Sequence, residues 1–169
     1  MQNHFELFQL EPGFDVDLAQ LESAYREIQA RVHPDRFVNA GSTEQRIAMQ
    51  WATRANEAYQ TLKNPLKRAS YLCELNGVAL QAESNTAMPA EFLMQQMEWR
   101  EELEQARDQP EVLLELEKAV QQSRRDQAGK IAEQMKQKNY PQAAQLIRQW
   151  MFLEKFANEV DNRISAAHG

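Results

Sequence analysis

Six prolines divide this chain into stretches in which apolar residues recur every three or four positions. This spacing lines the apolar side chains along one face of an α-helix. Proline marks a helix boundary because it has no backbone N–H and clashes with the preceding turn. One such stretch, at 16–32, carries Leu18, Leu21, Tyr25, Ile28 and Val32. Only five of the 169 residues are glycine, and no segment alternates with the period of a strand, so the sequence predicts an all-α protein.

The first 77 residues are expected to form a domain built on an antiparallel helical hairpin with short helices beside it. About ten residues after the helix of 16–32, a second apolar seam runs along Ile47, Trp51, Ala55, Ala58 and Leu62. Two helices joined by so short a connection pack antiparallel. Ser42 and Gln45 have the spacing of a capping box, so we expect Ser42 to cap the second helix.

A domain boundary is expected in the linker 78–88, where the apolar periodicity is lost. The preceding helix should begin at Pro65 and end at Gly77, a residue type favoured just past helix C-termini. Beyond the linker, 89–169 holds three amphipathic stretches with short connections, which favours a three-helix bundle. These three helices should open at Pro89, Pro110 and Pro141.

Charge and cysteine content argue against several classes of protein. The formal net charge is −6 and the chain has no basic block, which argues against nucleic acid or a membrane surface as a partner. Cys73 is the only cysteine, so one chain holds neither a disulfide nor a cysteine-based metal site, and we expect no metal and no cofactor. The sequence shows no basic and apolar leader and no long apolar run, so we expect a cytoplasmic protein.

The connection within the hairpin contains the triplet His33-Pro34-Asp35. Pro34 should end the preceding helix near Val32, because proline disfavours the helical conformation in the residue before it. The imidazole, which can donate and accept hydrogen bonds, and the carboxylate, which can accept two from an arginine, are then displayed in a loop. By themselves they could equally be ordinary turn residues. Because no phosphate-binding glycine loop, nucleophile elbow or metal-ligand spacing accompanies them, we do not expect an enzyme.

The wider pattern around this triplet resembles a J domain, the module with which co-chaperones stimulate ATP hydrolysis by DnaK-type chaperones. The matching residues are Tyr25-Arg26, Val32-His33-Pro34-Asp35-Arg36-Phe37, Asn56-Glu57-Ala58-Tyr59-Gln60-Thr61-Leu62 and Asn64-Pro65. The continuation resembles the HscB family, the J-type co-chaperones of iron–sulfur cluster assembly. It is carried by Pro65-Leu66-Lys67-Arg68-Ala69-Ser70-Tyr71-Leu72, Phe92-Leu93-Met94 and Met97-Glu98-Trp99-Arg100-Glu101-Glu102-Leu103.

This resemblance implies that the J domain, residues 1–77, docks on a partner chaperone, which for the family is HscA. His33, Pro34 and Asp35 would make the contact that stimulates ATP hydrolysis. Nothing in such a scheme makes the chain itself a catalyst.

Arg26 and Arg31, on the helix before the triplet, would face an acidic surface of the chaperone. They could instead form only local ion pairs on a solvated helix. The residue before the histidine is often tyrosine in J domains, and here it is Val32. Glu22 and Glu27 make this helix less basic than in general-purpose J domains, which favours a dedicated partner.

Some apolar residues of the C-terminal half fall outside the stripes that would pack the bundle. Such surplus apolar side chains indicate an exposed binding surface, although they could also widen the core or pack against the J domain. In the HscB family this half holds the cluster scaffold protein IscU and hands it to the chaperone. The resemblance therefore implies a scaffold-binding surface with a polar rim, comprising Leu93, Met94, Met97, Glu98, Glu101 and Phe152.

Two other functions compete with this interpretation. A J-domain co-chaperone for a different client would stimulate the chaperone and ignore the scaffold. A helical adaptor in which the triplet is a coincidence would leave the chaperone's ATP hydrolysis unchanged.

Overall fold

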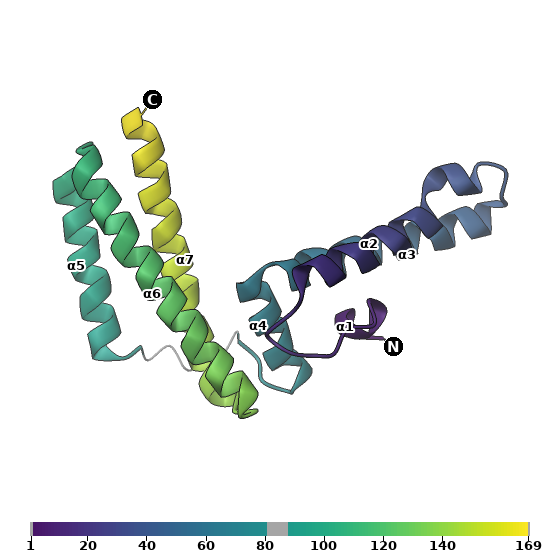
Figure 1. Cartoon of the computed structure of the whole chain (residues 1–169), viewed down its shortest axis with the longest axis horizontal. Helices are drawn as coiled ribbons and strands as arrows, with labels where there is room; N and C mark the ends of the chain where they lie inside the picture. Colours follow the sequence, from purple (N-terminus) through teal and green to yellow (C-terminus); the bar gives the residue numbers. More distant parts are fainter. Residues whose placement is uncertain (1, 81–87, 169) are drawn as a thin grey trace. The chain divides into compact units, whose positions relative to one another are not determined.

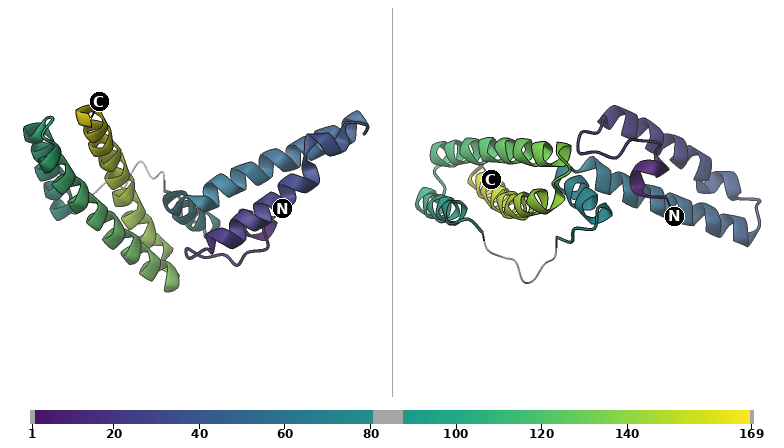
Figure 2. Two further views of the ribbon diagram at one scale, coloured as in Figure 1. Left: turned by 45° about the horizontal axis from the view of Figure 1, so that its top comes forward. Right: turned by 90° about the horizontal axis from the view of Figure 1, so that it is seen from below.

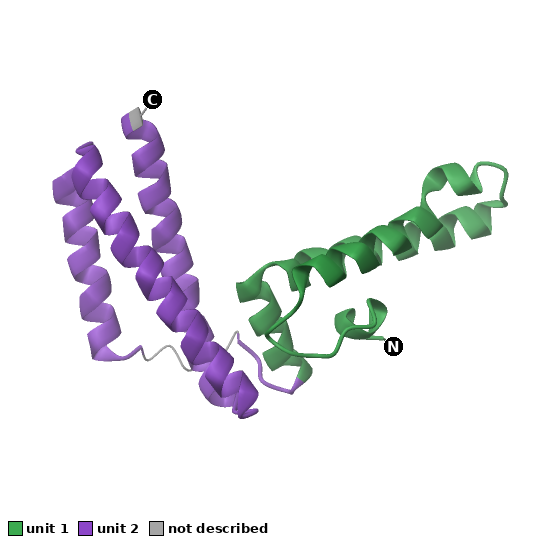
Figure 3. Ribbon diagram, in the orientation of Figure 1, with its two compact units in different colours: residues 1–75 green, residues 76–169 purple. Residues whose placement is uncertain are grey.

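The computed structural model describes residues 2–80 and 88–168, and no strand occurs in them, so the predicted all-α fold is confirmed. The described chain forms two compact units, Met1–Leu75 and Asn76–Gly169 (Figure 3). Most of the predicted linker, at 81–87, lies outside the described residues.

The first unit is a hairpin of two long helices with two shorter helices packed on it (Figure 1). In chain order its elements are α1 (His4–Leu7), α2 (Leu18–Val32), the 3-10 helix η1 (Pro34–Phe37), α3 (Ser42–Lys63) and α4 (Pro65–Leu75). The aromatic rings of Tyr25 on α2 and Tyr59 on α3 stack with centroids 4.1 Å apart. The core lies toward the α4 end of the hairpin and contains Phe5, Phe8, Leu21, Leu62 and Leu72.

Local chemistry explains where these helices begin. Asp17 accepts hydrogen bonds from the backbone N–H groups of Ala19 and Gln20, which makes it the N-cap of α2. Asn64 caps α4 in the same way through the N–H of Lys67, and Pro65 occupies the first helical position as predicted. Gly77 follows α4 with φ of 80°, a conformation that only glycine adopts at little cost.

The predicted capping box of α3 is wrong. Gly41 occupies the N-cap and makes no side-chain cap bond, so Ser42 is already helical. Because the helix starts one residue earlier than the motif requires, Gln45 falls one position past the one that would reach back to the N-cap backbone. Its side-chain amide donates instead to the carbonyl oxygens of Phe37 and Ala40 in the preceding connection, at 2.8 and 3.3 Å.

The predicted apolar seam of α3 is buried only in part. Ala55, Ala58 and Leu62 are buried, whereas Ile47 and Trp51 are 47 % and 40 % exposed. The views of Figures 1 and 2 place α1 beside the middle of the hairpin, and the short η1 packs at its loop end, where Ala48 is buried. Helical periodicity is therefore kept along α3, but toward the loop end the small side chain of Ala48 is buried while the larger Ile47 and Trp51 are not.

The second unit contains α5 (Ala90–Ala106), α6 (Pro110–Lys136) and α7 (Tyr140–His168). Arg100 pairs with Glu159, and three residues later the Leu103 carbonyl accepts from Arg163, so α5 and α7 run in the same direction. Helix α6 runs antiparallel to both (Figure 2). The three helices enclose a core that includes Trp99, Leu103, Leu113, Leu116, Ile131, Ile147, Leu153 and Phe156.

Polar contacts also join the helices of this unit. Nε and Nη2 of Arg124 on α6 donate to the two oxygens of the Glu154 carboxylate on α7, at 2.7 and 2.9 Å. The indole N–H of Trp150 donates to the same carboxylate at 3.0 Å. Because a two-pronged arginine–carboxylate pair has a fixed geometry, it helps to set the register of α6 against α7.

Candidate functional site

The loop site, defined as His33, Pro34 and Asp35, follows directly on the end of α2. His33 has φ −59° and ψ 136°, outside the helical region, as expected for a residue before proline. The next four residues are not the open loop that we predicted, because Pro34–Phe37 form the 3-10 turn η1. This turn fixes the directions in which the two polar side chains leave the backbone.

The side chains of His33 and Asp35 are both accessible. Nδ1 of His33 accepts a hydrogen bond from the backbone N–H of Asp35 at 3.2 Å, so the histidine itself caps the turn. With Nδ1 used as an acceptor, a neutral imidazole carries its proton on Nε2, where it can donate to another molecule. The side chain of Asp35 is 88 % exposed, and its nearer oxygen lies 3.6 Å from Nδ1 of His33.

The structure does not bring Arg26 and Arg31 together as a single docking surface. Five residues correspond to about 140° around an α-helix, so the two side chains leave α2 in different directions. Each also pairs with the glutamate four residues earlier: Arg26 with Glu22 at 2.7 Å and Arg31 with Glu27 at 2.6 Å. Exposed pairs of this kind contribute only about 0.3–0.5 kcal/mol. A stronger acidic partner could therefore displace either glutamate.

Sequence reasoning missed how the loop site is held. Besides the two bonds from Gln45 to the carbonyls of Phe37 and Ala40, the N–H of Arg36 donates to the His33 carbonyl at 3.0 Å. Phe37 is half-buried against the hairpin. The only signal in the sequence was the glutamine at the start of α3, and its helix-capping spacing led to a different assignment.

The second candidate surface is the apolar patch, defined as Leu93, Met94, Met97 and Phe152. These side chains are 48 %, 61 %, 69 % and 52 % exposed, respectively. The core of the bundle on α5 is provided instead by Trp99, Leu103 and Ala106. Within their own unit, the patch residues are therefore exposed and available to a partner.

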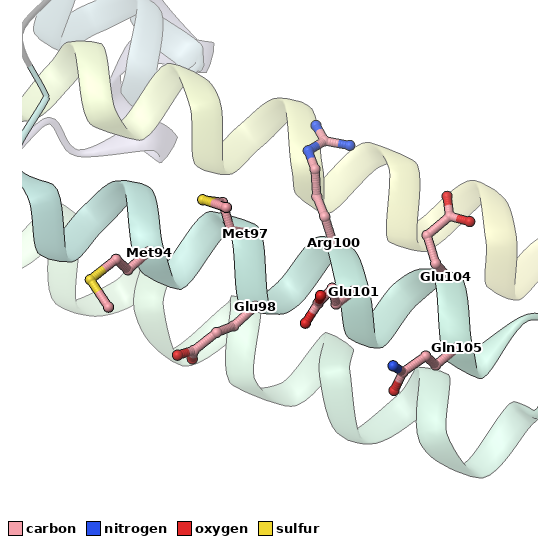
Figure 4. A pocket seen from close by; sticks show the side chains of 7 residues that line it. All are labelled: Met94, Met97, Glu98, Arg100, Glu101, Glu104 and Gln105. Atoms are coloured by element: carbon pink, nitrogen blue, oxygen red, sulfur yellow. The ribbon is translucent and has the colours of Figure 1, made fainter.

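Helix geometry relates the members of this patch to one another. Leu93 precedes Arg100 by seven residues, which is two turns along the same face, and Phe152 precedes Glu159 by the same interval. Because α5 and α7 run parallel and Arg100 pairs with Glu159, Leu93 and Phe152 fall at the same level of neighbouring helices. Met97 lies between them and that ion pair, on the edge of α5 that also bears Arg100 (Figure 4).

The predicted rim residues Glu98 and Glu101 lie on the opposite edge and the front of α5 (Figure 4). Together with Met94, Met97, Arg100, Glu104 and Gln105 they line a hollow of about 610 Å³ along this helix. Helix α5 contains five glutamates and one arginine, and that arginine is paired. The hollow is consequently acidic around an apolar centre.

The described residues contain no group of three or more histidine, cysteine or acidic side chains arranged to hold a metal ion. None of the helices described is long and apolar enough to cross a membrane.

Similarity to known proteins identifies the family of this chain. Residues 88–161 match the model of the HscB C-terminal oligomerisation domain. The co-chaperone protein HscB homologue of Bordetella petrii is 50 % identical over 159 residues, covering 94 % of each chain. This chain belongs to the HscB family of co-chaperones.

Other HscB relatives extend the match over nearly the whole chain. The homologue of Burkholderia thailandensis is 49 % identical over 164 residues, or 96 % of this chain and 94 % of its own. Chaperone HscB from Vibrio cholerae has a TM-score of 0.87 at 36 % identity, covering 98 % of this chain and 99 % of its own. Human HscB has a TM-score of 0.91 at 26 % identity, with coverage of 96 % and 82 %.

HscB membership confirms the family resemblance and, with it, the J domain. It supports a co-chaperone role in iron–sulfur cluster assembly, and the relatives are named as co-chaperones. The roles of the individual residues in the loop site and the apolar patch stay predictions.

Proposed function

We propose that this HscB-family chain brings a scaffold client and its chaperone together at two separate surfaces. The loop site stimulates ATP hydrolysis by a DnaK-type chaperone of the HscA kind, with Arg26 and Arg31 assisting. The apolar patch, rimmed by Glu98 and Glu101, holds the iron–sulfur scaffold IscU. The chain acts in the cytoplasm, and any cluster is carried by its client.

The corresponding division of the chain is a J domain at 1–77, a linker at 78–88 and a client-binding bundle at 89–169. The chain catalyses no reaction of its own in this proposal. Its effect is to supply contacts that favour the hydrolysing state of its partner, because a ligand shifts an equilibrium only by its differential affinity for the two states.

The observation that carries the chaperone role is the unused bonding capacity of the loop site. Within the chain, His33 uses only Nδ1 for a hydrogen bond, and its Nε2 and the Asp35 carboxylate remain accessible. A carboxylate in that position can accept two parallel hydrogen bonds from an arginine of the partner. Polar side chains pre-positioned on a 3-10 turn also lose little freedom when they bind.

The apolar patch supports the client-binding role. Four large apolar side chains are exposed on two adjacent helices, and such clusters on soluble proteins mark binding surfaces. Burying each one would contribute about 1.5–3 kcal/mol, so a few of them can anchor a client. The acidic surroundings favour a client with basic residues beside its apolar contact.

Single-turnover ATP hydrolysis by the HscA-type chaperone tests the proposal. The chain and its His33→Gln variant would each be added with and without scaffold. We expect stimulation that rises further with scaffold and is abolished by His33→Gln, while the free energy of unfolding changes by no more than about 0.5 kcal/mol because the side chain is exposed.

Three results would contradict parts of this proposal. Undiminished stimulation by folded His33→Gln would remove the loop site from the mechanism. Stimulation that is indifferent to scaffold would leave a J-domain co-chaperone for another client. No stimulation by the unaltered chain, with a competent chaperone, would favour a helical adaptor.

A further inference from the structure

We propose that Met94 and Met97 are a reversible oxidation site that controls client binding. Conversion of their thioethers to sulfoxides by a peroxide weakens the hold of the apolar patch on its client, and reduction by a dithiol-dependent reductase restores it. This inference rests on the proposed client-binding role of the apolar patch.

The first support is accessibility. Met94 and Met97 are 61 % and 69 % exposed, whereas Met135 in the bundle core is only 7 % exposed. Figure 4 shows both side chains extending away from the backbone of α5, and because they are three residues apart they are neighbours on one face of the helix. Because methionine oxidation requires the oxidant to reach the sulfur, these two thioethers are far better placed to react than the buried one.

The second support is the position of the two sulfurs within the candidate contact. Leu93 and Phe152 complete the apolar patch and cannot be oxidised in this way, so the two methionines are its chemically responsive half. Met49 is a natural comparison, because it is 70 % exposed but lies on α3 in the other unit. Oxidation at Met49 should leave the patch unaffected.

The reaction is balanced without any metal. A lone pair on sulfur attacks one oxygen of hydrogen peroxide and the O–O bond breaks. The proton of the transferred oxygen passes to the departing hydroxide, so the S=O bond forms and water leaves. The sulfur loses two electrons and the peroxide gains them. In the reverse step, two thiols of a reductase system supply two electrons and two protons, a disulfide forms, and the sulfoxide oxygen leaves as water.

The surroundings make the product unfavourable in a bound client complex. A sulfoxide oxygen carries partial negative charge and accepts hydrogen bonds, whereas the nearby Glu98 and Glu101 offer only further acceptors when ionised. Arg100 is the one cation that lines the hollow. Its Nη1 and Nη2 atoms donate to Glu159 at 2.9 and 3.2 Å, so the charge of this guanidinium is already balanced by a carboxylate.

A client that docks against the patch must therefore strip water from a sulfoxide without replacing its hydrogen bonds. Burial of an uncompensated polar group commonly costs enough to weaken binding by about tenfold or more for each group. We expect oxidation of both methionines to reduce scaffold affinity by at least about tenfold.

The test uses the full chain. It is treated with hydrogen peroxide, the peroxide is removed with catalase, and peptide mass spectrometry reports oxidation at each methionine. Scaffold affinity is then measured before oxidation, after oxidation, and after repair by methionine sulfoxide reductases with dithiothreitol. Affinity should fall as Met94 and Met97 are oxidised and return on repair.

Two variants serve as controls, and each is compared with itself before and after peroxide. Met49→Leu should lose affinity on oxidation as the unaltered chain does. Met94→Leu combined with Met97→Leu should show no further loss on oxidation, whatever its starting affinity. Bound scaffold should also slow oxidation of Met94 and Met97 in the unaltered chain, while leaving the rate at Met49 unchanged.

The outcomes separate this inference from the proposed function. Failure of the unoxidised chain to bind scaffold would overturn the client-binding role itself. Binding that survives full oxidation of both methionines, or that is lost equally in the double leucine variant, would overturn only the oxidation site.

Discussion

At the scale of single residues, Arg68 shows how one buried side chain organises the first unit, Met1–Leu75. It is 7 % exposed, and its guanidinium donates to the carbonyls of Phe14 and Leu62 at 2.7 Å each. It also lies over the Phe14 ring, 5.2 Å from the centroid. Burial lowers the pKa of the guanidinium, and nearby Asp15 raises it. The arginine thus ties the segment before α2 to the corner between α3 and α4.

Replacing Arg68 by methionine should lower the free energy of unfolding by roughly 2–3 kcal/mol. The long apolar side chain fills much of the space, but two carbonyl groups lose a charged donor in a buried position. Denaturant unfolding would measure this loss. Lys67→Met is the matched control, because that exposed neighbour should change stability by less than about 0.5 kcal/mol. Equal stability of both variants would mean that the buried bonds contribute nothing.

His4 gives the first unit a pH-dependent contact. Its ring stacks on Tyr71 with centroids 4.3 Å apart, and burial lowers its pKa, opposed by Glu57 and assisted by Arg54. A histidine whose pKa is lower in the folded state takes up a proton more readily when unfolded. The contribution of the neutral His4 ring to the free energy of unfolding is therefore present above the unfolded pKa near 6.5. It is lost as the pH falls through the lower pKa of the folded state.

We expect the melting temperature of the chain to fall more between pH 7.5 and 5.5 than that of His4→Phe, which keeps the stacked ring without the titration. The readout is the difference between the two proteins, so that other titrating groups cancel. A fall of the same size in both would show that His4 does not contribute to the pH dependence.

At the scale of elements, the loop site depends on the first turn of α3 as much as on its own residues. Gln45 holds the connection through two carbonyls, while η1 orients His33 and Asp35. A helical hairpin with the same triplet but a free connection would present the same groups over many conformations. Holding these groups in one conformation lowers the entropic cost of docking.

Gln45→Ala should weaken stimulation of the chaperone mainly by raising the concentration of co-chaperone needed for half-maximal effect. The two lost hydrogen bonds correspond to roughly 1–3 kcal/mol of loop ordering. The maximal stimulation, reached at saturating co-chaperone, should be largely kept. Gln60→Ala, an exposed glutamine on the same helix, is the control. A titration curve for Gln45→Ala that overlays that of Gln60→Ala would argue that the connection needs no such support.

At the scale of the whole molecule, the two proposed binding functions lie in different units. The loop site lies in Met1–Leu75 and the apolar patch in Asn76–Gly169. Each can therefore be altered separately by substitution of exposed side chains.

Met97→Ala combined with Phe152→Ala should weaken scaffold binding by at least about tenfold, since two large apolar contacts are lost. Stimulation of the chaperone without scaffold should persist, because the loop site is untouched. Val112→Ala with Leu114→Ala is the control, since these side chains are similarly exposed on α6, at 40 % and 42 %. Unchanged scaffold affinity in the first pair would remove the apolar patch from the client interface.

Much of this architecture could be predicted from local chemistry. The three-and-four spacing identified the long helices, and the prolines and Gly77 marked most of their ends. The surplus apolar residues of α5 and α7 were predicted to be exposed, and they are. These features depend on residues within a few positions of one another, which is why a single sequence contains them.

Other features depend on which elements meet in space, and only the tertiary structure decided them. Ile47 and Trp51 carry the helical period of α3 but are only partly covered by their neighbours. Gln45 bonds across the connection rather than at a helix cap, and Arg68 is buried despite its charge. Helical periodicity is a property of the backbone itself, whereas burial and long-range hydrogen bonds are properties of neighbours that the local sequence does not specify.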